Sequence, residues 1–145
     1  MKAVVQRVQN ANLKVNGDLI SEIGNGLVVF YGVGKGDDYS KADYLASKIA
    51  KLRIFEDENG KMNKSVIDVG GEILCVSQFT LYGDVSHGNR PGFTEAEVPD
   101  IASKTYDYFC QKLIENGVIC KKGIFGADMK ITQLNDGPVT ILYEV

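Results

Sequence analysis

Hydroxyl groups that could act as nucleophiles stand at Ser77, Thr80, Ser86 and Thr140. A serine or threonine hydroxyl is a weak nucleophile unless an adjacent base takes its proton. His87 is the only histidine, and it lies in a polar segment, residues 86–90, that we expect to be a solvated loop. The pattern Gly-x-Ser-x-Gly is absent. The sequence therefore does not favour a histidine-based catalytic triad.

Residues that bind metal ions are few and scattered. A single histidine excludes the H-E-x-x-H pattern and other sites built from several histidines. The cysteines, Cys75, Cys110 and Cys120, have no C-x-x-C spacing. An odd number of unpaired cysteines is typical of reduced thiols and not of a disulfide framework. The sequence predicts neither a metal site nor a disulfide.

A glycine-rich segment, residues 32–36, lies between an expected strand and an expected helix, which is where phosphate-binding loops occur. The Walker pattern is absent. The pattern G-x-G-x-x-G also fails, because Asp37 stands where its last glycine belongs. We interpret this segment as a flexible turn that leads into a capped helix.

Two other segments are more distinctive. Residues 77–82, Ser-Gln-Phe-Thr-Leu-Tyr, end an apolar strand in polar groups around an aromatic ring. Residues 135–140 contain Gly137-Pro138, and the cis form of an X–Pro bond costs only about 0.5–1 kcal/mol over trans. A cis bond here would fix the directions of the flanking carbonyl groups. From the residues alone, the first segment could equally be an ordinary strand end, and the second could equally be a tight hairpin turn without a functional role.

Length and composition indicate one globular domain, residues 1–145, with 44% hydrophobic and 24% charged residues. The longest apolar run, residues 27–33, is far shorter than the roughly 20 residues of a membrane span. Polar residues follow soon after the N-terminus, so we expect no signal peptide and a cytoplasmic protein without a membrane partner. The net charge of −3 argues against broad binding of duplex nucleic acid, but it permits contact with a short single-stranded end.

The elements that must position these groups are mostly strands. Strand patterns cover residues 2–8, 13–15, 19–23, 27–33, 72–79, 118–120, 129–134 and 139–145. Helical spacing covers residues 40–53, with a capping box that begins at Ser40, and a second helix from Pro99 to Asn116-Gly117. Residues 83–94 form an expected loop. Hairpin signals such as Asn16-Gly17 dominate. We therefore predict an α+β fold, a largely antiparallel sheet or open barrel with two helices packed on one side.

At the two distinctive segments the sequence resembles the D-aminoacyl-tRNA deacylase family, which is marked by Ser-Gln-Phe-Thr-Leu and Asn-x-Gly-Pro-x-Thr. These stand here as residues 77–81 and 135–140. Further similar segments extend along the whole chain, at residues 6–8, 52–57, 60–63, 68–72 and 125–129. The chain departs from the family in the loop Arg90-Pro91-Gly92-Phe93, where the family usually has serine in place of Gly92. We assign no hydroxyl contact in that loop.

The resemblance implies an enzyme that hydrolyses the ester between a D-amino acid and the 3′-terminal ribose of tRNA. It also implies removal of glycine from mischarged tRNA and rejection of L-aminoacyl-tRNA. The implied assembly is a homodimer with each active site at the subunit interface, where residues 77–81 of one subunit face Gly137-Pro138 of the other. No metal or organic cofactor is expected. The terminal 2′-hydroxyl helps to activate water in this family, in agreement with the lack of an activated side-chain nucleophile here.

The expected site has a catalytic segment, a motif for chiral selection and supporting residues: Ser77, Gln78, Phe79 and Thr80; Gly137 and Pro138; and Arg7, Met129, Asn135 and Thr140. Gln78 and Phe79 would form the pocket floor and bind the adenosine end or the ester through main-chain donors. Thr80 is expected to position the substrate and not to attack it. Carbonyl groups held by a cis Gly-Pro bond would exclude an L side chain and still admit glycine. Arg7 would brace that motif or be a surface residue on an edge strand, and Met129 would line the pocket or belong to the core.

Two hypotheses from other functional classes remain open. A small acidic α+β domain without a catalytic dyad could bind a nucleotide or an amino acid without turnover, with residues 77–78 and 135–136 as ligand contacts. A purely structural dimer would neither bind nor react. Turnover of aminoacyl-tRNA separates these alternatives.

Overall fold

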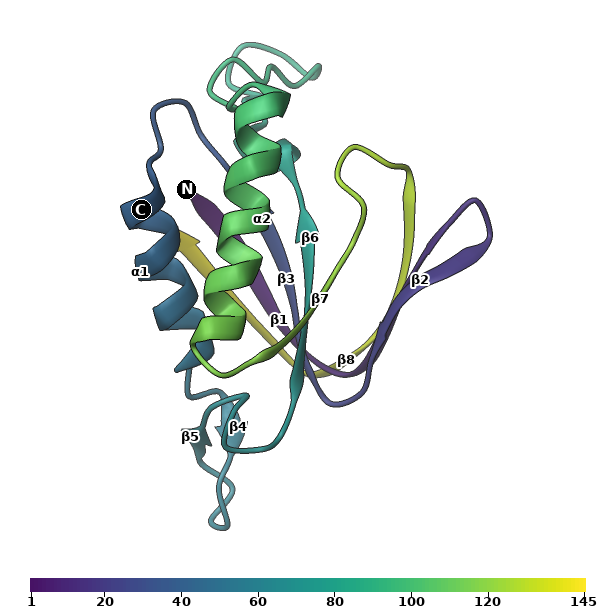
Figure 1. Ribbon diagram of the computed structural model, residues 1–145, viewed down its shortest axis with the longest axis vertical. Coiled ribbons are helices and arrows are strands. Elements are labelled where there is room, and N and C mark those ends of the chain that lie inside the picture. The colour runs from purple at the N-terminus through teal and green to yellow at the C-terminus, as the bar shows by residue number, and fades with distance from the viewer.

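A six-stranded mixed sheet forms the centre of the computed structural model, which describes residues 1–145, and both long helices lie on one face of the sheet (Figure 1). The sheet strands are β1 (Lys2–Val15), β2 (Asp18–Ile23), β3 (Gly26–Gly32), β6 (Glu72–Ser77), β7 (Ile119–Lys122) and β8 (Met129–Glu144). The remaining elements are the helices α1 (Tyr39–Ala50) and α2 (Pro99–Glu115), the short 3₁₀ helix η1 (Phe79–Tyr82), and a small hairpin of β4 (Phe55–Glu56) and β5 (Met62–Lys64). No helix is long and apolar enough to cross a membrane.

The strand directions follow from the connections between the strands. β1 pairs antiparallel with β2, β3 and β8, whereas β3, β6 and β7 are parallel to one another. Parallel neighbours need a crossover connection, and α1 and α2 supply the two crossovers. The predicted α+β fold with two helices on one side is confirmed, with a parallel part that the hairpin signals did not indicate.

β1 is one long strand, although its sequence predicts two strands separated by a break. Residues 2–8 pair with β3 and residues 11–15 pair with β2, so β1 passes from the flat part of the sheet into a projecting hairpin. The hairpin turns at Asn16 and Gly17, which have φ angles of 51° and 85°. Positive φ at both central residues is the requirement of this turn, and Asn-Gly meets it as expected.

The sheet curls toward closure on the side away from the helices. β2 and β7 end the strand order β2-β1-β3-β6-β7, yet they touch through side chains. The Ser21 hydroxyl donates to the Lys122 carbonyl at 2.5 Å, and Lys121 Nζ donates to the Glu22 carbonyl at 2.6 Å. These contacts give the sheet the open-barrel character that we expected.

β8 is also a single strand, so the predicted tight hairpin turn at residues 135–138 is wrong. In the ladder between β1 and β8, Val8 pairs with Asn135 and Gln6 pairs with Thr140. Between these pairs β1 has only Arg7, whereas β8 has residues 136–139. The extra residues form a bulge that contains the cis Gly137–Pro138 bond.

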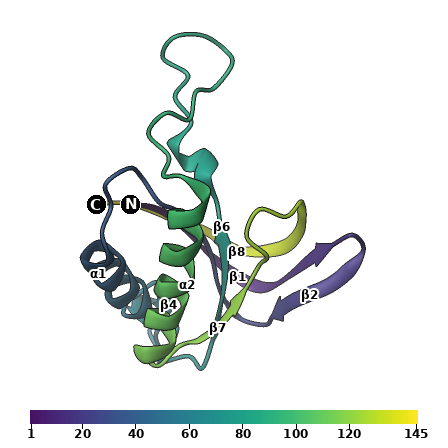
Figure 2. The ribbon, with the colours of Figure 1, turned by 45° about the horizontal axis from the view of Figure 1, so that its top comes forward.

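The element ends differ from the expected ones in two further places. Asp38, and not Ser40, caps α1, because its carboxylate accepts a hydrogen bond from the Lys41 backbone N–H at 3.2 Å. β6 ends at Ser77 and the chain turns into η1, so the predicted strand is too long by two residues. The second predicted helix is confirmed, with Pro99 in its first turn and Asn116 at its C-terminal cap. Figure 2 shows the expected loop between η1 and α2 projecting from one end of the molecule.

The apolar side chains form two cores, one on each face of the sheet. Alternate residues of β6 serve both: Ile73 and Cys75 face the helices, whereas Leu74 and Val76 face the interior of the curled sheet. This alternation explains why the β6 sequence is almost wholly apolar. At the centre of the helix-side core, the buried rings of Tyr31 and Phe109 stack with centroids 4.1 Å apart.

Phe109→Ala should lower the free energy of unfolding by about 3–5 kcal/mol, because it leaves a cavity against Tyr31 at the centre of the core. Ile114→Ala is the matched control on the same helix. Its side chain is 48% exposed, and we expect a change of no more than about 0.5 kcal/mol. Urea denaturation of both variants measures the difference, and equal effects would contradict this description of the core.

Candidate active site

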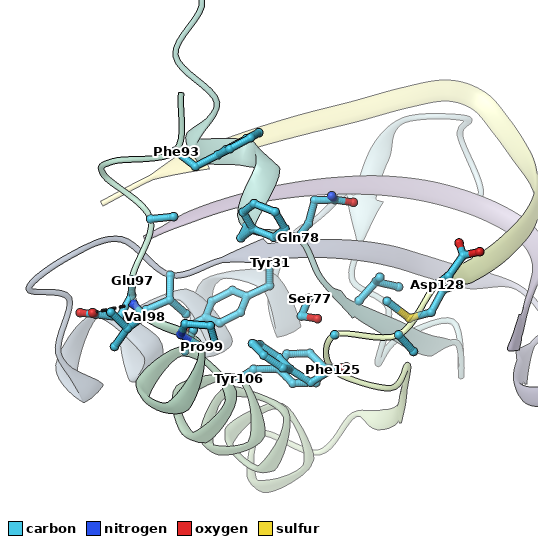
Figure 3. Close-up of a pocket in the computed structure, with 18 of the residues that line it drawn as sticks. Tyr31, Ser77, Gln78, Phe93, Glu97, Val98, Pro99, Tyr106, Phe125 and Asp128 are labelled. Atoms are coloured by element: carbon cyan, nitrogen blue, oxygen red, sulfur yellow. Dashed lines mark hydrogen bonds between the residues drawn. The ribbon is translucent and has the colours of Figure 1, made fainter. Parts of the chain in front are cut away.

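A cavity of about 740 Å³ opens where β6 ends, between the first turn of α2 and the segment that leads into β8. Most of its lining residues are hydrophobic, and its volume lies within the range of small-molecule sites. Figure 3 shows the rings of Tyr106 and Phe125 on the helix side of this cavity, with Ser77 and Gln78 on the sheet side. The cavity therefore lies at the expected catalytic segment.

Ser77, Gln78 and Phe79 line this cavity because β6 stops there and the chain turns. The Gln78 N–H still donates to the Tyr31 carbonyl at 2.8 Å, which continues the strand pairing by one bond beyond Ser77. Phe79 is 56% exposed and packs edge-on against Phe93, with ring centroids 5.0 Å apart. A large aromatic ring is thus held at the mouth of the cavity.

Thr80 does not line the cavity. Its hydroxyl oxygen accepts a hydrogen bond from the side-chain amide of Gln78, and an amide N–H cannot act as a base. His87 is exposed in the projecting loop and is also absent from the cavity wall. The Ser77 hydroxyl, which does line the cavity, has no hydrogen bond to a side chain that could act as a base.

Arg7 lies inside the protein, only 6% exposed, on a strand that pairs on both sides. Its description as a surface residue on an edge strand is therefore wrong. Nη1 donates to the Ile54 carbonyl at 2.6 Å, and Nε lies 3.2 Å from both the backbone carbonyl and the carboxylate of Asp136. The guanidinium thereby ties the bulge of β8 to the segment that precedes β4. A buried guanidinium needs such partners to offset its lost hydration.

Gly137 has a φ of 126°, in the region that side chains rarely adopt, and it is exposed together with Pro138. A Cβ atom added there would lie 2.8 Å from Val139 Cγ2 and 3.2 Å from Arg7 Nη2. The bulge therefore requires glycine at this position.

The structure brings some of the expected site residues to the cavity and leaves others apart. Ser77, Gln78, Phe79 and Met129 line the cavity, and Met129 also packs against the core of the curled sheet. The other expected residues do not line it: Arg7, Thr80, Asn135, Gly137, Pro138 and Thr140. Within one chain the two signature segments thus do not meet at one cavity.

Several lining residues were not expected from the sequence. Tyr106 is buried on α2, and its hydroxyl donates to the Cys75 carbonyl at 2.8 Å, whereas Phe125 comes from the segment before β8. Residues 125–129 resemble a family segment, and that was the one signal that could have indicated Phe125. Nothing in the amphipathic pattern of α2 distinguishes Tyr106 from an ordinary core residue.

The charged groups at the cavity are Lys35, Glu97 and Asp128. The Glu97 carboxylate accepts from the Val98 N–H at 2.8 Å and from the Gly36 N–H at 3.3 Å, and Asp128 pairs with Lys130 at 3.0 Å. The cysteines lie elsewhere, and burial raises the pKa of the Cys75 thiol, which makes it unreactive. No group of three or more His, Cys, Asp or Glu side chains could hold a metal ion.

The family model described as D-Tyr-tRNA(Tyr) deacylase matches residues 4–144. The chain belongs to this family. A D-aminoacyl-tRNA deacylase of Koribacter versatilis is 54% identical over 144 residues, which cover 99% of this chain and 97% of the relative. A protein of the same name from Syntrophus aciditrophicus is 52% identical with the same coverage. The predicted resemblance is therefore confirmed, and the expectation of a hydrolase agrees with these names.

Solved structures give the same fold. A structure titled c-Myc DNA Unwinding Element Binding Protein is 45% identical, with a TM-score of 0.95 over 100% of this chain and 99% of that chain. A probable eukaryotic D-amino acid tRNA deacylase has a TM-score of 0.84 at 17% identity, over 99% of this chain and 98% of that chain. The second match shows how well this fold is kept when the sequence changes.

Asp37 anchors the elements that frame the cavity. Its carboxylate, 5% exposed, accepts from Lys41 Nζ at 2.7 Å, from the Gly34 N–H at 2.8 Å and from the Tyr82 hydroxyl at 3.3 Å, and the Met1 amino group lies 2.6 Å away. Tyr82 ends the 3₁₀ helix that begins at Phe79. Burial alone would raise the pKa of Asp37, but the bonds from Lys41, the amino group and Gly34 together hold it below its usual value.

Asp37→Asn should lower the free energy of unfolding at pH 7 by about 2 kcal/mol, because hydrogen bonds to the charged carboxylate are lost. A lowered pKa in the folded state stabilises the protein above the pKa of the unfolded chain, near 3.8, and this contribution disappears as the pH falls through the folded value. The difference between parent and variant should therefore shrink between pH 5 and pH 2, as chemical denaturation at each pH would show.

Asp18→Asn is the control for this prediction, because Asp18 is exposed and its carboxylate makes no hydrogen bond or ion pair. It should change stability little at any of these pH values. A difference for Asp37→Asn that stays constant with pH would contradict the assigned role of the carboxylate.

Proposed function

We propose that this chain hydrolyses the ester bond of D-aminoacyl-tRNA and releases a free D-amino acid and tRNA. The observation that carries this proposal is the cavity at the family's Ser77–Leu81 signature, in a chain that matches the family over residues 4–144. The only part of tRNA that such a cavity can enclose is the single-stranded 3′ end. An acidic protein can accept that end, because few phosphates need to be neutralised.

The aromatic lining suits the terminal adenosine. Phe79, Phe93, Tyr106 and Phe125 surround the cavity, and a nucleobase gains free energy by stacking on such rings. Tyr106 and Phe125 are held by the core, whereas Phe79 and Phe93 stand at the mouth. This arrangement supports a bound base between the helix side of the cavity and the signature segment.

The chemistry we propose is attack by water on the ester carbonyl. Thr80 has no base beside it, and its hydroxyl already accepts from Gln78, so a covalent aminoacyl intermediate lacks an activated nucleophile. Water adds to the carbonyl carbon, the tetrahedral intermediate collapses with cleavage of the bond to the 3′ oxygen, and that oxygen leaves with the proton that the water gave up. The main-chain N–H of Phe79 would stabilise the oxyanion, since the Gln78 N–H already donates to the Tyr31 carbonyl, and the neighbouring 2′-hydroxyl would help to activate the water.

We further propose a homodimer in which the Gly137–Pro138 segment of a second copy completes each site. This segment is exposed and does not line the cavity of its own chain. β8 also presents large exposed apolar side chains, Leu134 at 51% and Leu142 at 75%. Rigid backbone at this segment would exclude the side chain of an L-amino acid while a hydrogen atom fits, so glycine would also be removed. The site of this proofreading would be the cytoplasm.

Incubation with D-tyrosyl-tRNA, glycyl-tRNA and L-tyrosyl-tRNA tests the proposed function directly. We expect release of D-tyrosine and glycine, with L-tyrosine released at least a hundredfold more slowly because its side chain meets the backbone of the bulge. Free amino acid is measured against time and against the uncatalysed reaction. Binding of aminoacyl-tRNA without turnover would instead support a binding module, and neither binding nor turnover would support a structural dimer.

Thr80→Ala tests the role of the threonine. Because water is the proposed nucleophile, the variant should keep at least a tenth of the parent's kcat on D-tyrosyl-tRNA. Ser86→Ala, in the exposed loop, is the matched loss of a hydroxyl outside the cavity and should be neutral. An aminoacyl ester trapped on Thr80, found by mass spectrometry of the quenched reaction, would show that the threonine is the nucleophile.

A further inference from the structure

Gly137 and Pro138 of the β8 bulge are exposed, and Val139 is its one side chain that packs against the helix-side core. The bulge is held by polar contacts at its base. Arg7 holds Asp136 on the face of the sheet that carries the helices. Successive side chains of a strand point to opposite faces, so Gln6 reaches the other face of the same ladder.

On that face, side-chain hydrogen bonds join the two ends of the bulge. Gln6 Nε2 donates to Thr140 Oγ1, just after the bulge, at 3.3 Å. Gln6 Oε1 accepts from Gln133 Nε2 at 2.8 Å, and the same Nε2 donates to Asn135 Oδ1, just before the bulge, at 2.7 Å. The chain Asn135–Gln133–Gln6–Thr140 thus closes the base of the bulge from both sides.

Gln133 stands where the strand pattern favours an apolar residue. Met129 and Ile131 precede it on the same face of β8, and both pack against the core of the curled sheet. Its carbonyl oxygen is the only buried side-chain nitrogen or oxygen without a hydrogen-bond partner. A buried unpaired acceptor destabilises a protein relative to an apolar side chain of the same shape. The amide at this position is therefore explained by what its N–H groups hold and not by stability.

We propose that Gln6 and Gln133 are positioning residues that set the conformation of the Gly137–Pro138 bulge and thereby the discrimination between D- and L-aminoacyl esters. This inference rests on the proposed function of the bulge as the chiral filter. Arg7 fixes one face of the bulge and the two glutamines fix the other. Asn135 and Thr140, which the sequence indicated without a physical role, become the two anchor points.

Gln133→Met tests this inference because it keeps the size of the side chain and removes both hydrogen bonds together with the unpaired acceptor. We expect a melting temperature equal to or above that of the parent, and a D-to-L ratio of kcat/KM at least tenfold lower. A residue with only a structural role would change stability and leave the ratio alone. Gln9→Met is the matched control, since Gln9 is exposed on β1 and makes no side-chain hydrogen bond, and it should change neither quantity.

Substitutions at Gln6 provide a rescue. Gln6→Met removes the centre of the chain of hydrogen bonds and should lower the ratio as Gln133→Met does. Gln6→Glu still accepts from Gln133, and the Thr140 hydroxyl can reverse and donate to the carboxylate, so this variant should keep most of the parent's selectivity. Equal losses in Gln6→Glu and Gln6→Met would overturn the proposed hydrogen-bond chain.

Amide hydrogen exchange of Asp136, Gly137 and Val139 measures the rigidity of the bulge without the use of any substrate. Exchange should be at least tenfold faster in Gln133→Met and Gln6→Met than in the parent and in Gln9→Met. If the parent does not hydrolyse D-tyrosyl-tRNA, the proposed function fails while the exchange result still decides whether the glutamines hold the bulge. If the parent is active and exchange or the D-to-L ratio is unchanged in the Met variants, the inference is overturned.

Discussion

The ladder between β1 and β8 is the constraint on which the rest of the site depends. The two strands pair along nearly their whole lengths, from Lys2 with Glu144 to Val15 with Met129. Arg7 alone stands opposite residues 136–139, so the surplus residues must leave the ladder as a bulge. Because the strands pair again on both sides of it, from Asn10 with Leu134 onward and from Gln6 with Thr140 onward, the bulge cannot slide along the strand. Its position is thereby set by strand register, which the burial of alternate residues enforces.

A buried charge secures this bulge to the rest of the protein. The Arg7 guanidinium bonds to the Ile54 carbonyl on one side and to Asp136 on the other. It thereby connects the segment that precedes the β4–β5 hairpin to the Gly137–Pro138 segment. Removal of either acceptor would leave a buried charge short of partners, which costs far more than the loss of a surface contact. The bulge that we propose as the selective element is therefore braced by the body of the domain.

The cavity has a different origin. β6 supplies alternate side chains to two cores and then ends at Ser77, beside the first turn of α2. The space beyond the strand end is lined by rings whose positions the cores decide, such as Tyr106 on α2. Its carboxylates are engaged by backbone N–H groups or by Lys130, and no hydrogen bond joins the Ser77 or Thr94 hydroxyl to a base. Such a site is suited to hold a substrate that brings its own activating group.

Local patterns in the sequence determined much of this structure. Asn16-Gly17 specified a hairpin, Pro99 and Asn116-Gly117 bounded a helix, and alternating apolar residues identified most strands, because these signals act over a few neighbouring residues. The two signature segments also indicated the family. A lone histidine and scattered cysteines argued against a triad and a metal centre. None of these conclusions required contacts between distant residues.

Only the tertiary structure decided the features that depend on such contacts. The sequence suggested a hairpin turn at residues 135–138, but pairing with β1 on both sides makes β8 one strand with a bulge. The sequence allowed Arg7 to be either a support for the bulge or a surface residue. Its burial and its hydrogen bonds to Ile54 and Asp136 show that it supports the bulge. The sequence did not identify Tyr106 or the Gln6–Gln133 pair. Periodicity predicts on which side of a helix or strand a residue lies, but it does not predict which residue it contacts. Side chains far apart in sequence acquire their roles only when strand register and helix packing bring their atoms within bonding distance.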